Sequence, residues 1–237
     1  MSYASFPEDK PLTRLRETIQ ILRLCFSEEE VDFQGRLYEV HGFRLPVKPS
    51  NHIQIFGAAM GLKMVENVAG VADGVLVMMP TIEHIREVRK TIASVADKLS
   101  LKEEPAIACH LITAVSESRE EAERIAKQTL LKYIGIPVYR ASIMRMGFSE
   151  EVRTLEAART GKEDRVWEKV PTGMASRLMI YGTPEDCAEK INSFAAEGVS
   201  HPIIYPCMTD YGFPNNVNQT IQLFAPHIHS LREPDKD

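Results

Sequence analysis

The sequence predicts an α/β fold in which helices cover a parallel sheet. From residue 51 onward, short apolar runs are followed by amphipathic helical patterns four times. Each run is almost continuously apolar, as is typical of strands that helices bury on both faces. The chain shows no repeat of solenoid period and no segment of low complexity. We therefore expect a single α/β domain over residues 1–237, with a helical excursion between its third and fourth strands.

The first segment, residues 12–50, is expected to form a helix and a hairpin. Apolar side chains recur at steps of three and four residues, which predicts an amphipathic helix over residues 11–26. Pro11 suits the first turn of this helix, where its missing N–H costs nothing. The run VDFQGRLYEV then contains two β-prone stretches around Gln34 and Gly35, a pattern typical of a hairpin.

Residues 51–134 are expected to contain three strand–helix units. The strands are the runs HIQIFGAA, VLVMM and AIACHLITAV. A helix from Leu62 to Ala69 follows the first strand, and Thr81 can cap the helix after the second. After the third strand, Ser118 and Glu121 have the spacing of a capping box, which predicts another helix start.

The rest of the chain is expected to form a helical insertion over residues 135–177 and a last βα unit over residues 178–237. Breaks in the insertion are expected at Gly135, Pro137, Gly147, Gly161 and Pro171. In the last unit, Thr183 and Pro184 predict a helix start, and Gly198 predicts the end of that helix. HPIIYP is the expected final strand, and a closing helix is expected from Val217 to Leu231.

Composition and charge argue against several other classes of protein. Hydrophobic residues make up 44% of the chain and charged residues 26%, a balance typical of globular domains and not of disordered chains. The formal charge of −5 argues against nucleic acid or an anionic membrane as the main partner, because both require a basic surface. No apolar run approaches the roughly 18 residues of a membrane span, and the opening residues lack a secretory signal. We therefore expect a cytoplasmic protein.

The cysteines and histidines predict neither disulfides nor a metal site. Cys25, Cys109, Cys187 and Cys207 are far apart and form no C-x-x-C pair, so we expect all four to be reduced and mostly buried. The seven histidines are equally dispersed, and no metal-ligand motif is present. We therefore expect no bound metal.

The strongest candidate motif is GAAMGLK, residues 57–63, between a predicted strand and a predicted helix start. Small residues let backbone N–H groups approach an anion closely, and a helix N-terminus adds a partial positive charge, so this loop can bind a phosphate. The alternative is that Gly57, Ala58 and Ala59 only allow the strand and the helix to pack closely. The residues alone leave both interpretations open.

Five stretches of the chain together resemble the luciferase-like flavin and deazaflavin oxidoreductases. They stand in the order of that family and cover most of residues 12–206; they are LTRLRETIQILR, VDFQGRLYEV, IQIFGAAMGLKMVENVAGVADGVLVM, GIPVYRASIMRMGF and YGTPEDCAEKINSFAAEGVSHPIIYP. The stretch IPVYRASIMRMGF is most similar to the branch that uses coenzyme F-420, an 8-hydroxy-5-deazaflavin, rather than FMN. The resemblance therefore implies coenzyme F-420 or FMN as the cofactor.

Members of that family are (β/α)8 barrels, so the resemblance implies a partial TIM barrel with about four of the eight strands. It assigns the four predicted strands to the fifth to eighth positions of the barrel, and the first four strands are absent from this chain. Such a half-barrel exposes strand edges and one side of an apolar interior. We therefore expect a homodimer, or a complementary half-barrel chain, to cover the open side.

The resemblance also implies roles for single residues. The family places the cofactor phosphate in the loop 57–63, where Leu62 departs from a common proline. Carried over by position, the cofactor-binding residues are Gly57, Ala58, Ala59, Met60, Gly61, Lys63 and Met78. Met78 ends a strand at the active face of the barrel, although its residue type favours a core position, and Arg177 is the candidate for substrate binding. His110 is expected to be a core residue within its strand. In the family, the groups around the redox ring come from early strands of the barrel, so the resemblance implies no catalytic residue in this chain.

Two functions follow from the resemblance. The first is an oxidoreductase that transfers a hydride or performs monooxygenation on a small organic substrate, with a partner supplying the other half of the barrel. The alternative is a truncated, non-catalytic cofactor-binding protein or a dimeric flavoprotein-like protein. An unrelated α/β domain without either function is the third interpretation.

Overall fold

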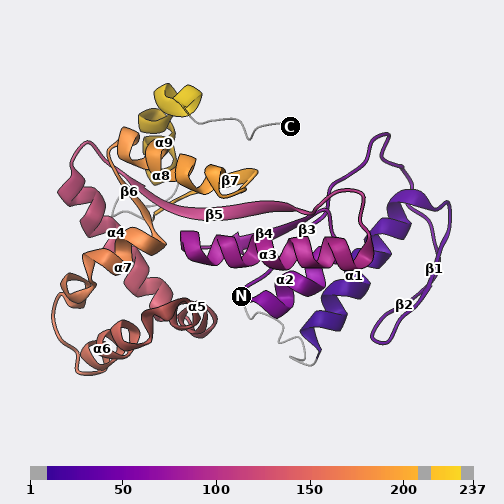
Figure 1. Ribbon diagram of the computed structural model, residues 1–237, viewed down its shortest axis with the longest axis horizontal. Helices are drawn as coiled ribbons and strands as arrows, with labels where there is room; N and C mark the ends of the chain where they lie inside the picture. The colour runs from indigo at the N-terminus through magenta and orange to yellow at the C-terminus, as the bar shows by residue number, and fades with distance from the viewer. Residues whose placement is uncertain (1–9, 208–214, 231–237) are drawn as a thin grey trace. The chain divides into compact units, whose positions relative to one another are not determined.

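The computed structural model describes residues 10–207 and 215–230 (Figure 1). The chain divides into two compact units. Unit 1 comprises residues 1–76 and 91–106, and unit 2 comprises residues 77–90 and 107–237, in each case where they are described. Strand β4 (Gly74–Met78) and helix α3 (Ile82–Leu99) each run from one unit into the other.

Unit 1 begins with helix α1 (Pro11–Ser27), followed by the antiparallel strands β1 (Val31–Gln34) and β2 (Glu39–Phe43) (Figure 1). These bounds confirm the predicted helix and hairpin. Ile19 on α1 is only 2% exposed, whereas Leu12 and Leu22 of the same periodic set are 37% and 38% exposed, so the apolar face of the helix is only partly covered.

A buried carboxylate joins this helix to the hairpin. Glu17 on α1 accepts three backbone N–H groups of the hairpin turn at 2.7, 2.9 and 3.0 Å; the donors are Arg36, Leu37 and Tyr38. Burial by itself raises the pKa of Glu17, but the three N–H donors outweigh it, so the net pKa lies below the ordinary value. A side chain at Gly35 would meet Glu17 Oε2 at 2.5 Å, so the glycine leaves room for the carboxylate.

Unit 1 also contains a parallel pair of strands formed by β3 (Phe56–Ala58) and β4, and helix α2 (Leu62–Ala69) follows β3. The helix has its predicted bounds, but the strand is shorter than the run HIQIFGAA predicts. Asp73, just before β4, explains the difference. Its carboxylate accepts the N–H of Ile55 at 2.6 Å and its own N–H donates to the Ile55 carbonyl at 2.9 Å, so Ile55 is bonded to a turn instead of a strand ladder.

Unit 2 is centred on the long strand β5 (Ala106–Val115). Strands β6 (Ile180–Gly182) and β7 (His201–Pro206) both pair with β5 in parallel. The N–H of Met79, just after β4, donates to the His110 carbonyl of β5 at 3.0 Å. Strands β5 and β7 have the bounds that their apolar runs predict. β6 is an additional short strand beyond the four predicted.

The insertion is helical and breaks at the glycines and prolines that the sequence singles out. It follows α4 (Arg119–Ile134), the helix of the third strand–helix unit, and its elements are α5 (Pro137–Ile143), a π-helical turn (Met144–Phe148), α6 (Ser149–Thr160), a 3-10 helix (Val166–Lys169) and α7 (Thr172–Leu178). Gly147 within the π-helical turn has a φ of 97°, which favours glycine. Buried side chains of these helices form one apolar core with Ile112 and Ala114 of β5.

The helices of unit 2 begin at the capping residues that the sequence predicts, but the capping box predicted at Ser118 is incomplete. Thr183 and Pro184 begin α8 (Pro184–Ala196) as predicted, where Thr183 and Asp186 form a capping box, and the Thr81 hydroxyl accepts the His84 N–H at 3.2 Å. Ser118 caps α4 through the Glu121 N–H at 3.2 Å, but the reciprocal bond of the capping box is missing there.

The missing bond is replaced by a relay through Ser116. The Ser116 hydroxyl donates to the Glu121 carboxylate at 3.1 Å, and its oxygen accepts the Ser118 N–H at 3.2 Å. A serine two residues before the cap therefore competes for the carboxylate that the spacing assigns to the box.

The closing helix ends earlier than predicted. Helix α9 spans Asn215–Phe224 and is followed by a 3-10 helix over Ala225–Ser230, whereas the sequence predicts a helix from Val217 to Leu231. Pro226 explains the change, because its ring cannot continue an α-helix. Leu231 lies outside the described residues.

All four cysteines are free and buried, as predicted: Cys25, Cys109, Cys187 and Cys207. Burial raises the pKa of Cys187 and of Cys207 to about 12, and it raises the pKa of Cys109 as well. Within the described part of the chain, no group of three histidine, cysteine or carboxylate side chains is placed to hold a metal ion. No helix in that part is long and apolar enough to cross a membrane.

We predict that Glu17→Gln weakens unit 1 in a pH-dependent manner. Because the folded state lowers the pKa of Glu17, its carboxylate contributes stability above the ordinary value of about 4.3 and loses that contribution as the pH falls through the folded value. The urea midpoint of the variant should therefore lie below that of the wild type at neutral pH, and the difference should shrink in acid. Glu29→Gln, at an exposed site, is the control. A difference that stays constant with pH would contradict this account.

Candidate functional site

The loop 57–63 of unit 1 connects the end of β3 directly to the first turn of α2. Ala58 pairs with Leu76 of β4, and the N–H of Ala59 continues this pairing by donating to the Leu76 carbonyl at 2.9 Å. Ala58 is exposed and Ala59 is buried, so the chain leaves the sheet with only small side chains at this point. Few side-chain atoms therefore shield the backbone from an approaching ligand.

The N-terminus of α2 has donors available to an anion. Its N-cap, Gly61, is extended and supplies no side-chain cap, while the Gly61 carbonyl accepts the N–H groups of Met64 and Val65 at 2.9 and 3.0 Å. The N–H groups of the preceding positions in the first turn have no intrahelical acceptor in an α-helix. The local backbone thus presents hydrogen-bond donors at the positive end of the helix dipole.

The charge in this first turn is opposite to the one that favours a helix start. Lys63 is exposed in the first turn, and α2 carries no acidic residue there. A cation at this end opposes the helix dipole, whereas a bound anion would be stabilised by both the dipole and the ammonium group. The set of donors therefore fits a phosphate.

Gly57 has a structural role that is independent of any ligand. A Cβ atom built at Gly57 would lie 2.7 Å from Cγ1 and 2.9 Å from Cγ2 of Val68 on α2. The glycine therefore lets α2 pack directly on β3. Close packing and phosphate binding are compatible, because the packing holds the N-terminus of α2 at the end of β3.

Met78 and Arg177 belong to unit 2. Met78 is half-buried and packs against the apolar core of that unit, beside the buried Met79. Arg177 donates to Glu83 at 3.1 Å, and its guanidinium carbon lies 5.0 Å from the centre of the Phe148 ring. A substrate anion at Arg177 would have to compete with the Glu83 carboxylate. The roles assigned to both residues stay predictions.

The structure thus brings six of the candidate residues together in one β–α turn, from Gly57 to Lys63, and places Met78 and Arg177 in the other unit. His110, expected in the core, is half-buried, and its ring lies 5.7 Å from that of Tyr205 on β7. The histidine therefore contributes to packing on this face of the sheet.

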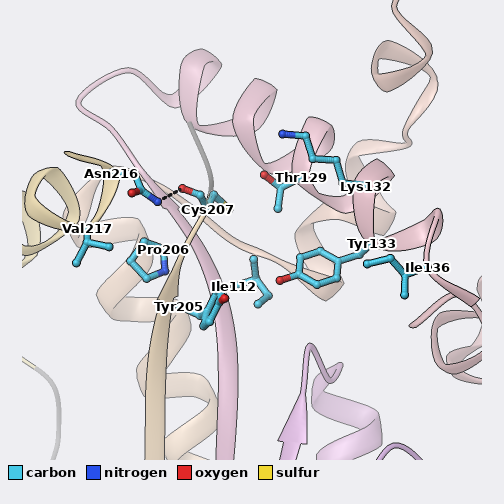
Figure 2. Close-up of a pocket in the computed structure, with 10 residues that line it drawn as sticks. All are labelled: Ile112, Thr129, Lys132, Tyr133, Ile136, Tyr205, Pro206, Cys207, Asn216 and Val217. Atoms are coloured by element: carbon cyan, nitrogen blue, oxygen red, sulfur yellow. Dashed lines mark hydrogen bonds between the residues drawn. The ribbon is translucent and has the colours of Figure 1, made fainter. Parts of the chain in front are cut away.

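Unit 2 also contains a cavity of about 380 Å³ that sequence reasoning did not identify (Figure 2). Its lining comes from β5, α4, β7 and α9, and it includes the buried polar residues Thr129 and Asn216. A threonine inside a helix and an asparagine near a helix start are common in exposed positions, so the sequence carries no signal that both are buried around one cavity.

The comparison with protein families gives one match that spans most of the chain. The family model described as luciferase-like monooxygenase matches residues 2–201. Among curated proteins, the 5,10-methylenetetrahydromethanopterin reductase of Archaeoglobus fulgidus is 27% identical over 202 residues, which are 82% of this chain and 60% of that protein. The chain therefore spans about 60% of the length of this relative.

Solved structures show the same fold. The coenzyme F-420 dependent tetrahydromethanopterin reductase of Methanopyrus kandleri matches with a TM-score of 0.72 at 18% identity, over 92% of this chain and 63% of that one. The oxygenating constituent of 3,6-diketocamphane monooxygenase of Pseudomonas putida, solved in complex with FMN, matches with a TM-score of 0.61 at 13% identity, over 93% and 64%. These likenesses confirm the predicted α/β fold with a partial barrel.

We predict that Gly57→Ala lowers the free energy of unfolding by about 1–3 kcal/mol, because the added Cβ overpacks against Val68. Val68→Ala removes the two atoms that the new Cβ would meet, so the double variant should be more stable than the sum of the single effects. Urea unfolding of the four proteins measures this coupling. Strictly additive losses would show that α2 does not pack on Gly57 in this way.

Proposed function

Because the chain belongs to the luciferase-like monooxygenase family, we propose that it holds the phosphate of a deazaflavin or flavin cofactor at residues 57–63, as part of an oxidoreductase. The cofactor would be coenzyme F-420 or FMN, and the substrate a small organic molecule. The first-turn donors of α2 and the exposed Lys63 carry this proposal, since they form a cationic donor set without a carboxylate in that turn.

The chain and the cofactor would have separate tasks. When bound, the cofactor would supply the redox chemistry of the reaction. Gly61 and the N–H groups after it would hold the phosphate, and Lys63 would neutralise part of its charge. The contact between Gly57 and Val68 would keep this binding loop in place. Met78 remains a candidate for contact with the cofactor and Arg177 for contact with the substrate.

Unpaired strand edges support a partner. Among the described residues, β7 pairs only with β5, and its side chains alternate in exposure, with His201, Ile203 and Tyr205 exposed. Parallel strands with a free edge and exposed apolar side chains favour association. We propose a homodimer or a complementary half-barrel chain as the partner.

A non-catalytic cofactor-binding protein is the second candidate function. The observation that favours it is the length of the match, since the chain spans about 60% of the curated reductase. The two functions differ in a direct test, which is hydride transfer by the purified chain to or from coenzyme F-420. Turnover by the chain alone would exclude the non-catalytic function.

We predict that the chain binds FMN more tightly than riboflavin, which lacks the phosphate. Lys63→Gln should weaken FMN binding about three- to tenfold and leave riboflavin binding unchanged, because only the phosphate meets the ammonium. Gly61→Val should weaken FMN binding as well, since its side chain would obstruct the approach to the backbone. Flavin fluorescence titrations measure these affinities.

Lys102→Gln is the charge-matched control for this titration. Lys102 is exposed in the same unit but lies outside the loop 57–63, so its loss should leave FMN affinity unchanged. Equal affinity of the wild type for FMN and riboflavin would argue against a phosphate site. Repeating the titration with coenzyme F-420 tests which of the two cofactors is preferred.

We also predict that the chain has a solution mass above that of one copy, and that Ile203→Lys reduces it. A charge on the exposed face of β7 opposes burial of that face in an interface. Val47→Lys replaces an exposed apolar residue elsewhere and should not change the mass. Light scattering after size exclusion gives the masses. A single-copy mass for the wild type would exclude the homodimer and leave the complementary chain.

A further inference from the structure

We propose that the cavity of unit 2 is a binding site for a compact, uncharged and mainly apolar molecule that carries a hydrogen-bond donor such as a hydroxyl. The cavity lies where β5, α4, β7 and α9 meet, and its volume is about 380 Å³ (Figure 2). This volume falls within the roughly 300–1,000 Å³ of pockets that bind small molecules. The site lies entirely within unit 2, so the inference is independent of the phosphate loop in unit 1.

Most of the cavity wall is apolar. Ile112 of β5 is 1% exposed and forms part of the floor, while Ile136 between α4 and α5 is 43% exposed and stands at the rim. Pro206 of β7 and Val217 of α9 complete the apolar side. A ligand with a hydrocarbon body would gain from leaving water here, and Ile136 marks the side from which it can enter.

Two buried polar atoms of the lining make no hydrogen bond to a nitrogen or oxygen atom among the described residues, and one of them has only the weak Cys207 thiol beside it. They are the hydroxyl oxygen of Thr129 and the side-chain oxygen of Asn216, and both residues are at most 5% exposed. The Asn216 side-chain N–H donates to the Cys207 carbonyl at 3.1 Å, which fixes its other atom as an acceptor (Figure 2). Buried polar atoms without partners are uncommon and costly, so a ligand that brings a donor would satisfy one of them.

The other groups around the cavity argue for an uncharged ligand. Burial raises the pKa of Tyr133 to about 12 and that of the Cys207 thiol to about 12, so both stay neutral at ordinary pH. The phenol oxygen of Tyr133 points toward Ile112 and Tyr205, and the ring packs edge-on against Tyr139 with centres 5.1 Å apart (Figure 2). No carboxylate belongs to the described lining, and Lys132, its one charged residue, is exposed.

The chemistry of the lining also separates ligand classes. A carboxylate or sulfonate offers only acceptors, and it would leave the Asn216 oxygen unpaired while losing its own hydration. An alcohol offers a donor for that oxygen or for Thr129, and its oxygen can accept from the Tyr133 phenol. A primary alcohol on an aromatic or aliphatic body is therefore the chemistry that fits best.

The test uses 3-phenyl-1-propanol as the probe and propylbenzene as its match without the hydroxyl. The full chain is labelled at the isoleucine δ1 methyl groups and titrated with each probe by NMR. Saturable shifts of the Ile112 and Ile136 methyls, with tighter binding of the alcohol, are the expected result. Absence of shifts, or equal shifts of isoleucines throughout the chain, would overturn the proposal.

One pair of variants and one single variant, tested with both probes, separate binding in the cavity from loss of the fold. Ile136→Trp should block the rim and weaken the alcohol at least tenfold, whereas Val138→Trp, at an exposed position of α5 outside the lining, should not. Thr129→Val should weaken the alcohol about three- to tenfold without weakening propylbenzene, and with little change in stability, since the hydroxyl it removes has only the weak Cys207 thiol as a partner. Equal effects of the two tryptophan variants, or equal effects of Thr129→Val on both probes, would contradict the site.

Discussion

The close approach of α2 to β3 is the constraint on which the candidate cofactor site depends. Strand β3 has only three residues, so its ladder alone cannot hold the helix that follows it. The missing side chain at Gly57 lets Val68 pack on the strand. Gly74 likewise leaves room for a neighbour, because a Cβ there would lie 2.2 Å from the Phe56 ring. The first contact packs α2 on β3, and the second packs β3 on β4. A larger residue at either position would move the donors of the loop without touching any of them.

Carboxylates that accept backbone N–H groups hold together segments that are distant in the sequence. Glu17 connects α1 to the turn of the hairpin, and Asp73 accepts the Ile55 N–H while also pairing with Arg23 of α1 at 2.8 Å. Burial by itself raises the pKa of Asp73, but its donors, with Arg23 foremost, lower it below the ordinary value. Unit 1 therefore combines small sheets with charged hydrogen bonds that join its helix, its hairpin and its loops.

Local patterns were enough to predict most elements, and tertiary packing explains the rest. Residues 62–69 and 106–115 have their predicted bounds because periodicity and neighbouring turn residues act within a few positions. The short β3 depends on Asp73, which lies eighteen residues from the Ile55 whose N–H it accepts, and the relay through Ser116 depends on which donor the Glu121 carboxylate accepts from. The loop 57–63 could be proposed as a candidate from the sequence because glycine and small residues have a direct geometric meaning. The cavity could not, because the burial of Thr129 is decided by strands and helices remote in the chain.

The burial of all four thiols has a consequence for the behaviour of the chain in solution. A thiol reacts as its anion, and burial raises the pKa of three of the four while also blocking reagents. Alkylation must therefore wait until the surrounding structure opens. Cys25 lies in unit 1 and the other three cysteines lie in unit 2, so the alkylation rates of the cysteines in each unit report how often that unit opens locally. Alkylation of the native cysteines can thus show whether the two units open together or separately.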